Sequence, residues 1–311
     1  MVKRVVSIGL PVDEKMEIIK NTIEPEKISG NEKRICIVTG THGDELEGQY
    51  VCYEINRIIN ENKQYLKGIV DIYPALNPLG IDSISRGIPM FDLDMNRIFP
   101  GDKEGAMPEY VASKIIDDIL GADMCVDIHS SNIFLMEIPQ VRISEQTADR
   151  LVPYAKMLNI DFIWVHAAAT VLESTLAHSL NSIGVPTLVV EMGVGMRITQ
   201  SYGNQLVKGL LNLMKSMGIW TGPVEEVKEP IISRNDEVGF VNAEASGVFV
   251  PKIKHGDNVK KGEHIGDILK AVTGEVLHKV EAPCDGMVFT LREYPIVYEG
   301  SLIARIIGGV K

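Results

Sequence analysis

The sequence predicts an α/β domain, in which a central sheet is flanked by helices, followed by a smaller all-β domain. Short apolar runs alternate with helical patterns over residues 1–222, which is typical of an α/β sheet. From residue 231 onward the chain reads as short strands separated by turn residues, without a helical period. The charged segment 221–230, which is flanked by prolines, fits a linker. We therefore expect domains at 1–222 and 223–311.

The composition is that of an ordinary folded protein, and the charge excludes one class of partner. The chain has 311 residues, of which 45% are hydrophobic, and this length has room for two domains. The formal charge of −11 repels phosphate backbones, so we expect no nucleic-acid partner. No apolar run approaches the roughly 18 residues of a membrane span, and the N-terminal run is too short for a signal sequence. The four cysteines show no CxxC motif, so we expect reduced core thiols in a cytoplasmic protein without a membrane partner.

Apolar runs predict the strands of the central sheet. They are "ICIVTG" (35–40), "IVDIYPAL" (69–76), "DMCVDI" (123–128), "DFIWV" (161–165) and "PTLVVEMG" (186–193). Helical stretches carry terminal signals, which are acids in the first turn, Pro near the start or Gly at the end. They cover residues 44–61, 108–121, 174–184 and 205–218.

Polar residues with chemical uses follow or end these strands. They are His42, Asn77, His129, His166 and Glu191. Ligands of open α/β sheets bind beyond the carboxyl ends of the strands. We therefore expect these side chains to gather at one edge of the sheet.

His42 and Glu45 have the spacing of two metal ligands. Chance gives about 7 × 42/311, roughly one, His with an acid three residues later, and the chain holds three such pairs. His42 and Glu45 flank a predicted helix start, where positions i and i+3 share one side. The other pairs, at 264/267 and 278/281, fall in predicted strands, where i and i+3 point to opposite faces. The alternative for His42 is a loop residue that caps the next helix.

His129 is the best third ligand for a zinc ion, because a catalytic zinc site commonly uses two His and one Glu and keeps one position open. In "VDIHSSN", Asp127 and His129 share one face of a strand, so Asp127 can orient the ring. His166 is the rival ligand, but we interpret it as a histidine of the core or rim.

The segment 77–101 is rich in Gly and Pro, shows neither a helical nor a strand period, and carries Arg86, Asn96 and Arg97. Loops of this length in compact domains are usually functional. Two arginines near a cleft of an acidic protein suggest the capture of a carboxylate, and surface salt bridges are the alternative.

Glu191 follows an apolar run, where an isolated carboxylate is costly unless it is paired or has a chemical role. Burial would raise its pKa toward the working pH, which suits a general base. The alternative is a partner for an arginine of the same cleft.

Several motifs then occur in one order: "HGDE" (42–45), Asn77-Pro78, Arg86, "DLDMNRIFPG" (92–101), "DIHSS" (127–131) and "VEMG" (190–193). This order resembles the succinylglutamate desuccinylase/aspartoacylase family, within the zinc carboxypeptidase-like superfamily, from about residue 33 to the C-terminus. The resemblance implies a mixed central sheet and one zinc ion per chain, held by His42, Glu45 and His129.

The resemblance also implies roles for the other motif residues. Glu191 would be the base that activates the zinc-bound water, and Arg86 would polarise the scissile carbonyl. Asn96 and Arg97 would hold the free carboxylate of the substrate. Asp94 would support His42 from outside the metal site.

The C-terminal β domain looks like the barrel-sandwich hybrid of biotinyl and lipoyl carriers. The hairpin that would present a modified lysine reads "KAVTGEVLH", in which the carrier lysine is not recognisable, so we predict no such modification. In the family this domain can supply a tyrosine to the active site, and Tyr294 and Tyr298 are equal candidates.

The sequence therefore predicts a zinc-dependent hydrolase that cleaves the amide bond of an N-acyl amino acid, a small substrate with a free carboxylate. One alternative is a metallocarboxypeptidase that acts on a small peptide. The other is a non-catalytic descendant that binds zinc or a ligand. The acyl group, the amino acid and a homo-oligomeric assembly are left open.

Overall fold

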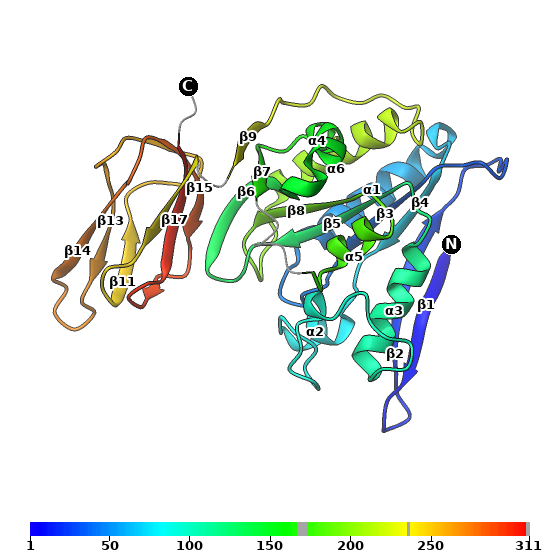
Figure 1. Ribbon diagram of the computed structural model, residues 1–311, viewed down its shortest axis with the longest axis horizontal. Coiled ribbons are helices and arrows are strands. Elements are labelled where there is room, and N and C mark those ends of the chain that lie inside the picture. The colour runs from blue at the N-terminus through cyan, green and yellow to red at the C-terminus, as the bar shows by residue number, and fades with distance from the viewer. Residues whose placement is uncertain (167–172, 235–236, 309–311) are drawn as a thin grey trace.

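The computed structural model describes residues 1–166, 173–234 and 237–308, and its larger α/β part lies beside a smaller β part (Figure 1). The helices are α1 (Glu47–Glu61), α2 (Pro78–Ser83), α3 (Met107–Ile119), α4 (Ala148–Ala155), α5 (Leu176–Ser182) and α6 (Gln200–Ser216). The first strands are β1 (Val2–Gly9), β2 (Lys15–Ile23), β3 (Arg34–Thr39), β4 (Ile69–Tyr73), β5 (Met124–Ser130), β6 (Leu135–Ser144), β7 (Phe162–His166), β8 (Thr187–Gly193) and β9 (Ile231–Arg234). The remaining strands are β10 (Val238–Asn242), β11 (Gly247–Pro251), β12 (Asn258–Val259), β13 (His264–Leu269), β14 (Val276–Glu281), β15 (Gly286–Arg292), β16 (Ile296–Val297) and β17 (Leu302–Gly308).

The central sheet is mixed, as the resemblance implies. Its strands run in the order β1-β2-β4-β3-β5-β8-β6, and β4, β3, β5 and β8 are parallel to one another. The β1–β2 hairpin is antiparallel at one end, and β6 is antiparallel to β8 at the other. The carboxyl ends of the four parallel strands therefore meet at one edge of the sheet.

Strand alternation gives the central sheet two separate cores. On β3, Ile35 and Ile37 face a core closed by α1, α4 and α6, whereas Cys36 and Val38 face a core closed by α3 and α5. On β5 the same alternation places Cys125 on the α3 and α5 side. Asp127 and His129 share this side, because they lie two and four residues further along the strand.

The C-terminal part continues the central sheet and adds a smaller one. β15 pairs with β6 from Arg292↔Leu135 to Thr290↔Glu137, and β17 and β10 follow β15 in the same sheet. The second sheet has the order β14-β13-β11-β16 and is antiparallel. An apolar core that includes Phe249, Ile268 and Ile306 fills the space between these strands. The predicted fold class is confirmed, whereas the boundary at residue 222 stays a prediction, and β9 pairs with β7 of the α/β part.

The predicted strands correspond to β3, β4, β5, β7 and β8, and the predicted helices to α1, α3, α5 and α6. The structure also contains four elements that the sequence analysis does not predict, which are the N-terminal hairpin, β6, α2 and α4. Pro139 interrupts the pattern of β6, and Pro153 interrupts that of α4. α6 begins at Gln200 instead of residue 205, and its first turn contains Gly203, where a Cβ would lie 2.4 Å from the Tyr50 ring. The packing of α6 against α1 therefore needs a glycine at this position, although glycine is a poor helix former.

The cysteines are free thiols, as the sequence predicts: Cys36, Cys52 and Cys125 are buried and Cys284 is half-buried. None of the described helices combines the length and the apolar character that crossing a bilayer requires.

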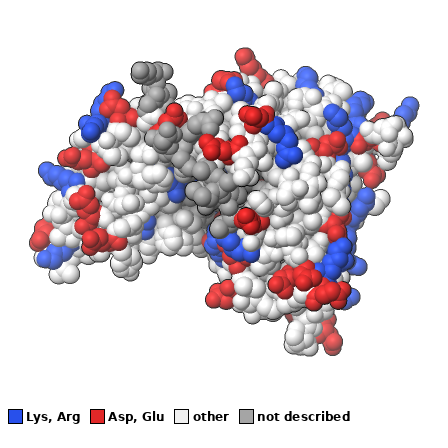
Figure 2. All heavy atoms as spheres, in the orientation of Figure 1, with Lys and Arg blue, Asp and Glu red and all other residues white. Residues whose placement is uncertain are grey.

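On the face shown in Figure 2, lysines and arginines are interspersed with aspartates and glutamates.

Candidate metal centre

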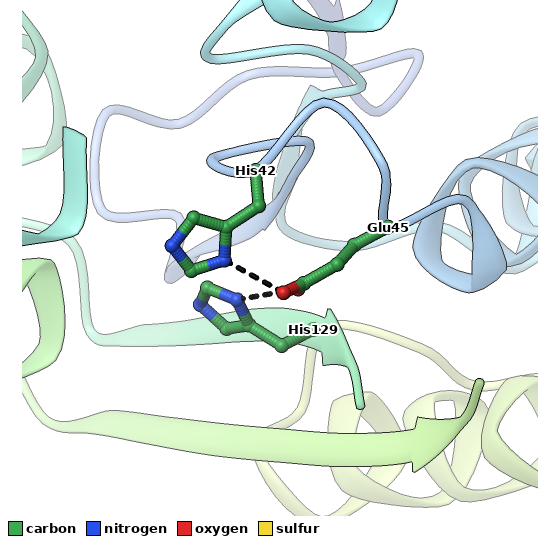
Figure 3. A group of neighbouring side chains, drawn as sticks. All are labelled: His42, Glu45 and His129. Atoms are coloured by element: carbon green, nitrogen blue, oxygen red, sulfur yellow. Dashed lines mark hydrogen bonds and ion pairs between the residues drawn. The ribbon is translucent and has the colours of Figure 1, made fainter. Parts of the chain in front are cut away.

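His42, Glu45 and His129 meet at the carboxyl edge of the parallel strands (Figure 3). One ligand atom of each residue lies within 4.8 Å of the others, and all three side chains are buried. The Glu45 carboxylate lies between the two rings, with Oε1 2.8 Å from His42 Nδ1 and Oε2 2.9 Å from His129 Nδ1. The backbone therefore brings together two imidazoles and one carboxylate from segments that are 84 residues apart in the chain.

Each ring turns Nδ1 toward this centre and Nε2 toward a second carboxylate. His42 Nε2 lies 2.9 Å from Asp94 Oδ1, and His129 Nε2 lies 3.1 Å from Asp127 Oδ2. The second contact has the distance but not the angles of a hydrogen bond, and within the described structure both Asp127 oxygens are buried without a hydrogen-bond partner. Carboxylates at this distance behind a ligating histidine fix the orientation of its ring.

The electrostatics of the cluster fit a divalent cation. Burial by itself would raise the pKa of Glu45, but His129 and His42 hold it far below its usual range. Burial by itself would lower the pKa of His129, but Asp127 and Glu45 raise it well above its usual range. The buried carboxylates thus require positive charge close by, and the raised pKa of His129 is one expression of this requirement. A cation would supply the same charge and leave the imidazoles neutral, and two imidazoles with one carboxylate are a donor set typical of catalytic zinc.

Local packing fixes the loop that carries two of these groups. His42 follows β3 and Glu45 precedes α1, so the loop between them turns at the carboxyl edge of the sheet. A Cβ on Gly43 would lie 2.0 Å from the carbonyl carbon of Gly80, so this loop packs against the backbone of α2 more closely than a residue with a side chain allows. The backbone N–H of Ser130 donates to Glu45 Oε2 at 3.1 Å, which ties the loop to the end of β5.

The cluster opens into a cavity of about 640 Å³ that runs along the polar side of β5, β8 and β6. The lining includes Glu191 and Arg86, together with Asn96 and Arg97 from the loop after β4. The predicted catalytic and binding residues therefore share one cavity with the cluster.

Glu191 lies beside His129, because the two residues are paired across β5 and β8. Neighbouring positions of paired strands point to the same face, so the Glu191 side chain faces the cavity. It is 16% exposed, and burial raises its pKa above the usual value. Its Oε1 lies 3.4 Å from Arg142 Nη1. Both interpretations from the sequence, a base and a partner of an arginine, thus agree with its position.

Arg86 connects Glu45 of the cluster with Asp94, the carboxylate behind His42. Its Nη1 donates to Glu45 Oε1 at 2.9 Å, and its Nη2 donates to Asp94 Oδ2 at 3.5 Å. Arg97 donates to the backbone oxygen of Asn96 at 2.7 Å, and its side chain is exposed at the rim of the cavity. The Asn96 side chain accepts from the backbone N–H of Leu176 at 2.9 Å, which anchors this loop to the start of α5.

Two expectations about histidines are wrong. His166 ends β7, which runs antiparallel to β8, so this strand end lies at the opposite edge of the sheet from His129, although His166 lines the same cavity. His264 and Asp267 do meet, at 2.7 Å, although residues i and i+3 of a regular strand point apart. A register shift at His264–Gly266 breaks the alternation there.

Asn77 has a structural position outside the cavity lining. Its Oδ1 accepts from the backbone N–H of Gly80 at 2.9 Å, and its Nδ2 donates to the Gly87 carbonyl at 3.0 Å. It caps α2 and holds the loop that presents Arg86. The helix α2 also corrects the expectation that segment 77–101 lacks regular structure.

Sequence reasoning missed three charged residues of the cavity, which are Glu137, Arg142 and Arg305. A lone arginine inside the apolar run "LIARIIG" was a signal of the same kind as Glu191. Tyr294 and Tyr298 are 47% and 72% exposed, and neither belongs to the cavity lining among the described residues.

Fold and cluster together define a class of α/β protein with a candidate metal centre at the carboxyl edge of a mixed sheet. The chain belongs to the succinylglutamate desuccinylase/aspartoacylase family, whose catalytic domain matches residues 31–217. It is 27% identical to the N-alpha-acetyl-L-2,4-diaminobutyric acid deacetylase of Halomonas elongata over 86% of this chain and 80% of that protein.

Solved structures show the same fold. A succinylglutamate desuccinylase/aspartoacylase from Rhodobacter sphaeroides superposes with a TM-score of 0.82, at 23% identity, over 98% of this chain and 95% of that chain. The product-bound ectoine utilization protein EutE (DoeB) from Ruegeria pomeroyi gives a TM-score of 0.83, at 22% identity, over 99% of this chain and 95% of that chain.

Replacement of Gly43 by Ala is expected to displace the loop between His42 and Glu45, because the new Cβ would lie 2.0 Å from Gly80. We expect a loss of about 1–3 kcal/mol in the free energy of unfolding and weaker zinc binding in calorimetric titration. Gly9→Ala is the matched control, since its Cβ would meet no atom within 4 Å. Wild-type stability and zinc affinity in Gly43→Ala would contradict this account of the loop.

Metal analysis of the purified, zinc-loaded chain is expected to find about one zinc ion per chain. His42→Ala should lose this zinc, because it removes one of the three converging donors. His166→Ala should keep it, although His166 lines the same cavity. Equal zinc contents in the two variants would show that the ion is held elsewhere.

Proposed function

We propose that this protein hydrolyses the amide bond of N-acyl amino acids with the help of zinc. The observation that carries the proposal is the position of Glu191, which lies beside His129 on the neighbouring strand and faces the same cavity as the His-Glu-His cluster. A metal centre with an adjacent carboxylate of raised pKa is the arrangement that hydrolytic water activation requires.

His42, Glu45 and His129 would hold the ion. Bound zinc supplies Lewis acidity, which lowers the pKa of a water molecule to about 7 and polarises a carbonyl group. Glu191 accepts the proton of the attacking water and returns it to the leaving amine. Arg86, which already donates toward the cluster, stabilises negative charge on the carbonyl oxygen.

The charge of the cavity supports a substrate with a single carboxylate. Four arginines line it, which are Arg86, Arg97, Arg142 and Arg305. Arg86, Arg142 and Arg305 each contact a carboxylate, whereas Arg97 has only a backbone oxygen as hydrogen-bond partner among the described residues. Arg97 is therefore the cation available to the carboxylate of an amino acid.

A neutral acyl group fits the remainder of the cavity better than an anionic one. A second carboxylate, such as that of a succinyl group, would find the other arginines already neutralised and would face Glu137 and Glu191. The curated relative from Halomonas elongata, a deacetylase by name, supports the same preference. The peptidase alternative uses the same groups, and the non-catalytic alternative leaves the raised pKa of Glu191 without a use.

Glu191→Gln is expected to keep zinc and lose turnover by about 100-fold or more, because glutamine cannot accept the proton. Zinc content and the rate of amide hydrolysis on N-acetyl amino acids measure the two properties separately. Turnover at the wild-type rate would assign the base elsewhere.

A panel of N-acetyl amino acids, the matching N-succinyl compounds and dipeptides tests the proposed substrate class. We expect kcat/KM for the acetyl compound to exceed that for the succinyl compound by about tenfold or more, because the second carboxylate lacks a cation. A preference for the dipeptide would favour the peptidase, and zinc binding without any turnover would favour the non-catalytic alternative.

Arg97→Met should raise KM for the N-acetyl substrate by roughly 10- to 100-fold, as expected for the loss of a charge-assisted hydrogen bond. The reason is that Arg97 is the arginine left to bind the carboxylate, and Arg97→Lys should recover part of the affinity because it retains the charge. An unchanged KM in Arg97→Met would place the carboxylate on another group.

A further inference from the structure

We infer that Arg142 is a positioning residue for Glu191, and that Arg305 of the C-terminal β part completes this positioning through Glu137. The inference rests on the proposed function, because Glu191 acts there as the base. It assigns the C-terminal part a role in catalysis that does not depend on a tyrosine reaching the cavity.

Arg142 connects two carboxylates of the cavity. Its Nη1 lies 3.4 Å from Glu191 Oε1, and its Nη2 donates to Glu137 at 2.8 Å and 3.0 Å. The contact with Glu137 is shorter, so the guanidinium is held mainly by Glu137 and only reaches toward Glu191.

Glu137 is the centre of the network and is 1% exposed. It accepts hydrogen bonds from Arg305 Nη1 at 2.6 Å, Gln140 Nε2 at 3.0 Å and Thr290 Oγ1 at 3.2 Å. A buried carboxylate of this kind is tolerated because cations and donors surround it. Arg305 is one of its two guanidinium partners, together with Arg142.

Arg305 contributes one of the two guanidinium charges that face Glu137 and Glu191. Arg142 and Arg305 carry two positive charges, which match the two negative charges of Glu137 and Glu191. Without Arg305, Arg142 would be the one arginine in contact with the two carboxylates among the described residues. Arg142 would then move toward the buried Glu137, and Glu191 would lose its restraint.

An aromatic ring limits where the two guanidinium groups can go. The guanidinium carbons of Arg142 and Arg305 lie 5.7 Å and 5.6 Å from the centre of the Trp164 ring. The ring attracts both cations and keeps them on the cavity side of β7.

The strand register fixes the position of Arg305 relative to the α/β part. Thr290 of β15 pairs with Glu137 of β6 on one side and with Arg305 of β17 on the other. The three residues form one row across the seam between the two parts, and side chains in such a row point to the same face. The pairing of β6, β15 and β17 thus fixes the backbone position from which the Arg305 side chain enters the cavity.

The test compares Arg305→Met, Arg305→Lys and a matched control, Arg292→Met. Arg292 lies at the same seam, where its backbone pairs with Leu135 and its side chain donates to the carbonyl oxygens of Tyr294, Ile296 and Leu302. It is absent from the described cavity lining. The readouts are kcat and KM on an N-acetyl amino acid, zinc content, the thermal midpoint, and crystal structures of the zinc-loaded wild type and Arg305→Met.

Arg305→Met is expected to lower kcat by about 10- to 100-fold, the effect of a misplaced catalytic group, with KM and zinc content unchanged. Arg305→Lys should recover part of kcat. Arg292→Met should keep the wild-type kcat even if its thermal midpoint falls. In the crystal structures, the contact between Arg142 Nη1 and Glu191 Oε1 should be lost in Arg305→Met.

Two results would overturn the inference: a wild-type kcat in Arg305→Met, or an equal loss of kcat in Arg292→Met, which would show only a weakened seam. Failure of the proposed function is distinguishable, because the zinc-loaded wild type would then turn over none of the substrates. In that case the crystal structures decide the inference: a displaced Glu191 in Arg305→Met supports it and an unchanged Glu191 overturns it.

Discussion

The structure depends on one buried carboxylate placed between two imidazoles. Glu45 is 3% exposed, and a charge at that depth is costly unless positive charge surrounds it. The chain places one imidazole on each side of it, from the loop after β3 and from the end of β5. The same need explains why Arg86, whose side chain is 42% exposed, directs its guanidinium group toward Glu45. The need to neutralise Glu45 therefore sets the geometry of the His42–Glu45–His129 cluster that a ligand in the cavity would meet.

Strand alternation places that centre on one face of the sheet. On β3 and the first half of β5, both faces are covered by helices and carry apolar side chains. Further along, Asp127, His129 and Glu191 occupy the face that α3 and α5 cover elsewhere, while the opposite face of β8 stays apolar. At the carboxyl ends of these strands, one face therefore remains part of an apolar core and the other lines the cavity.

Much of this arrangement could be predicted from the sequence, because it depends on local patterns. The residues of the cluster follow or end strands that their apolar runs reveal, and parallel strands bring such ends together. The position of His166 could not be predicted in this way, because the sequence of a strand does not give its direction in the sheet. β7 runs opposite to β8, so its carboxyl end lies at the other edge. His264 shows the other limit, since a bulge overrides the alternation expected of a strand.

The charged row across the seam could not be predicted, because it depends on pairing between distant strands. Glu137 and Arg305 are 168 residues apart, and β6 itself is hard to see because Pro139 interrupts it. Pairing of β15 with β6 sets which residue of the C-terminal part meets Glu137. A slip of β17 by one residue would turn Arg305 to the other face of the sheet and bring an apolar neighbour, Ala304 or Ile306, toward a buried carboxylate. The requirement to neutralise Glu137 thus selects one register, and the same register brings a positive charge of the C-terminal part into the cavity.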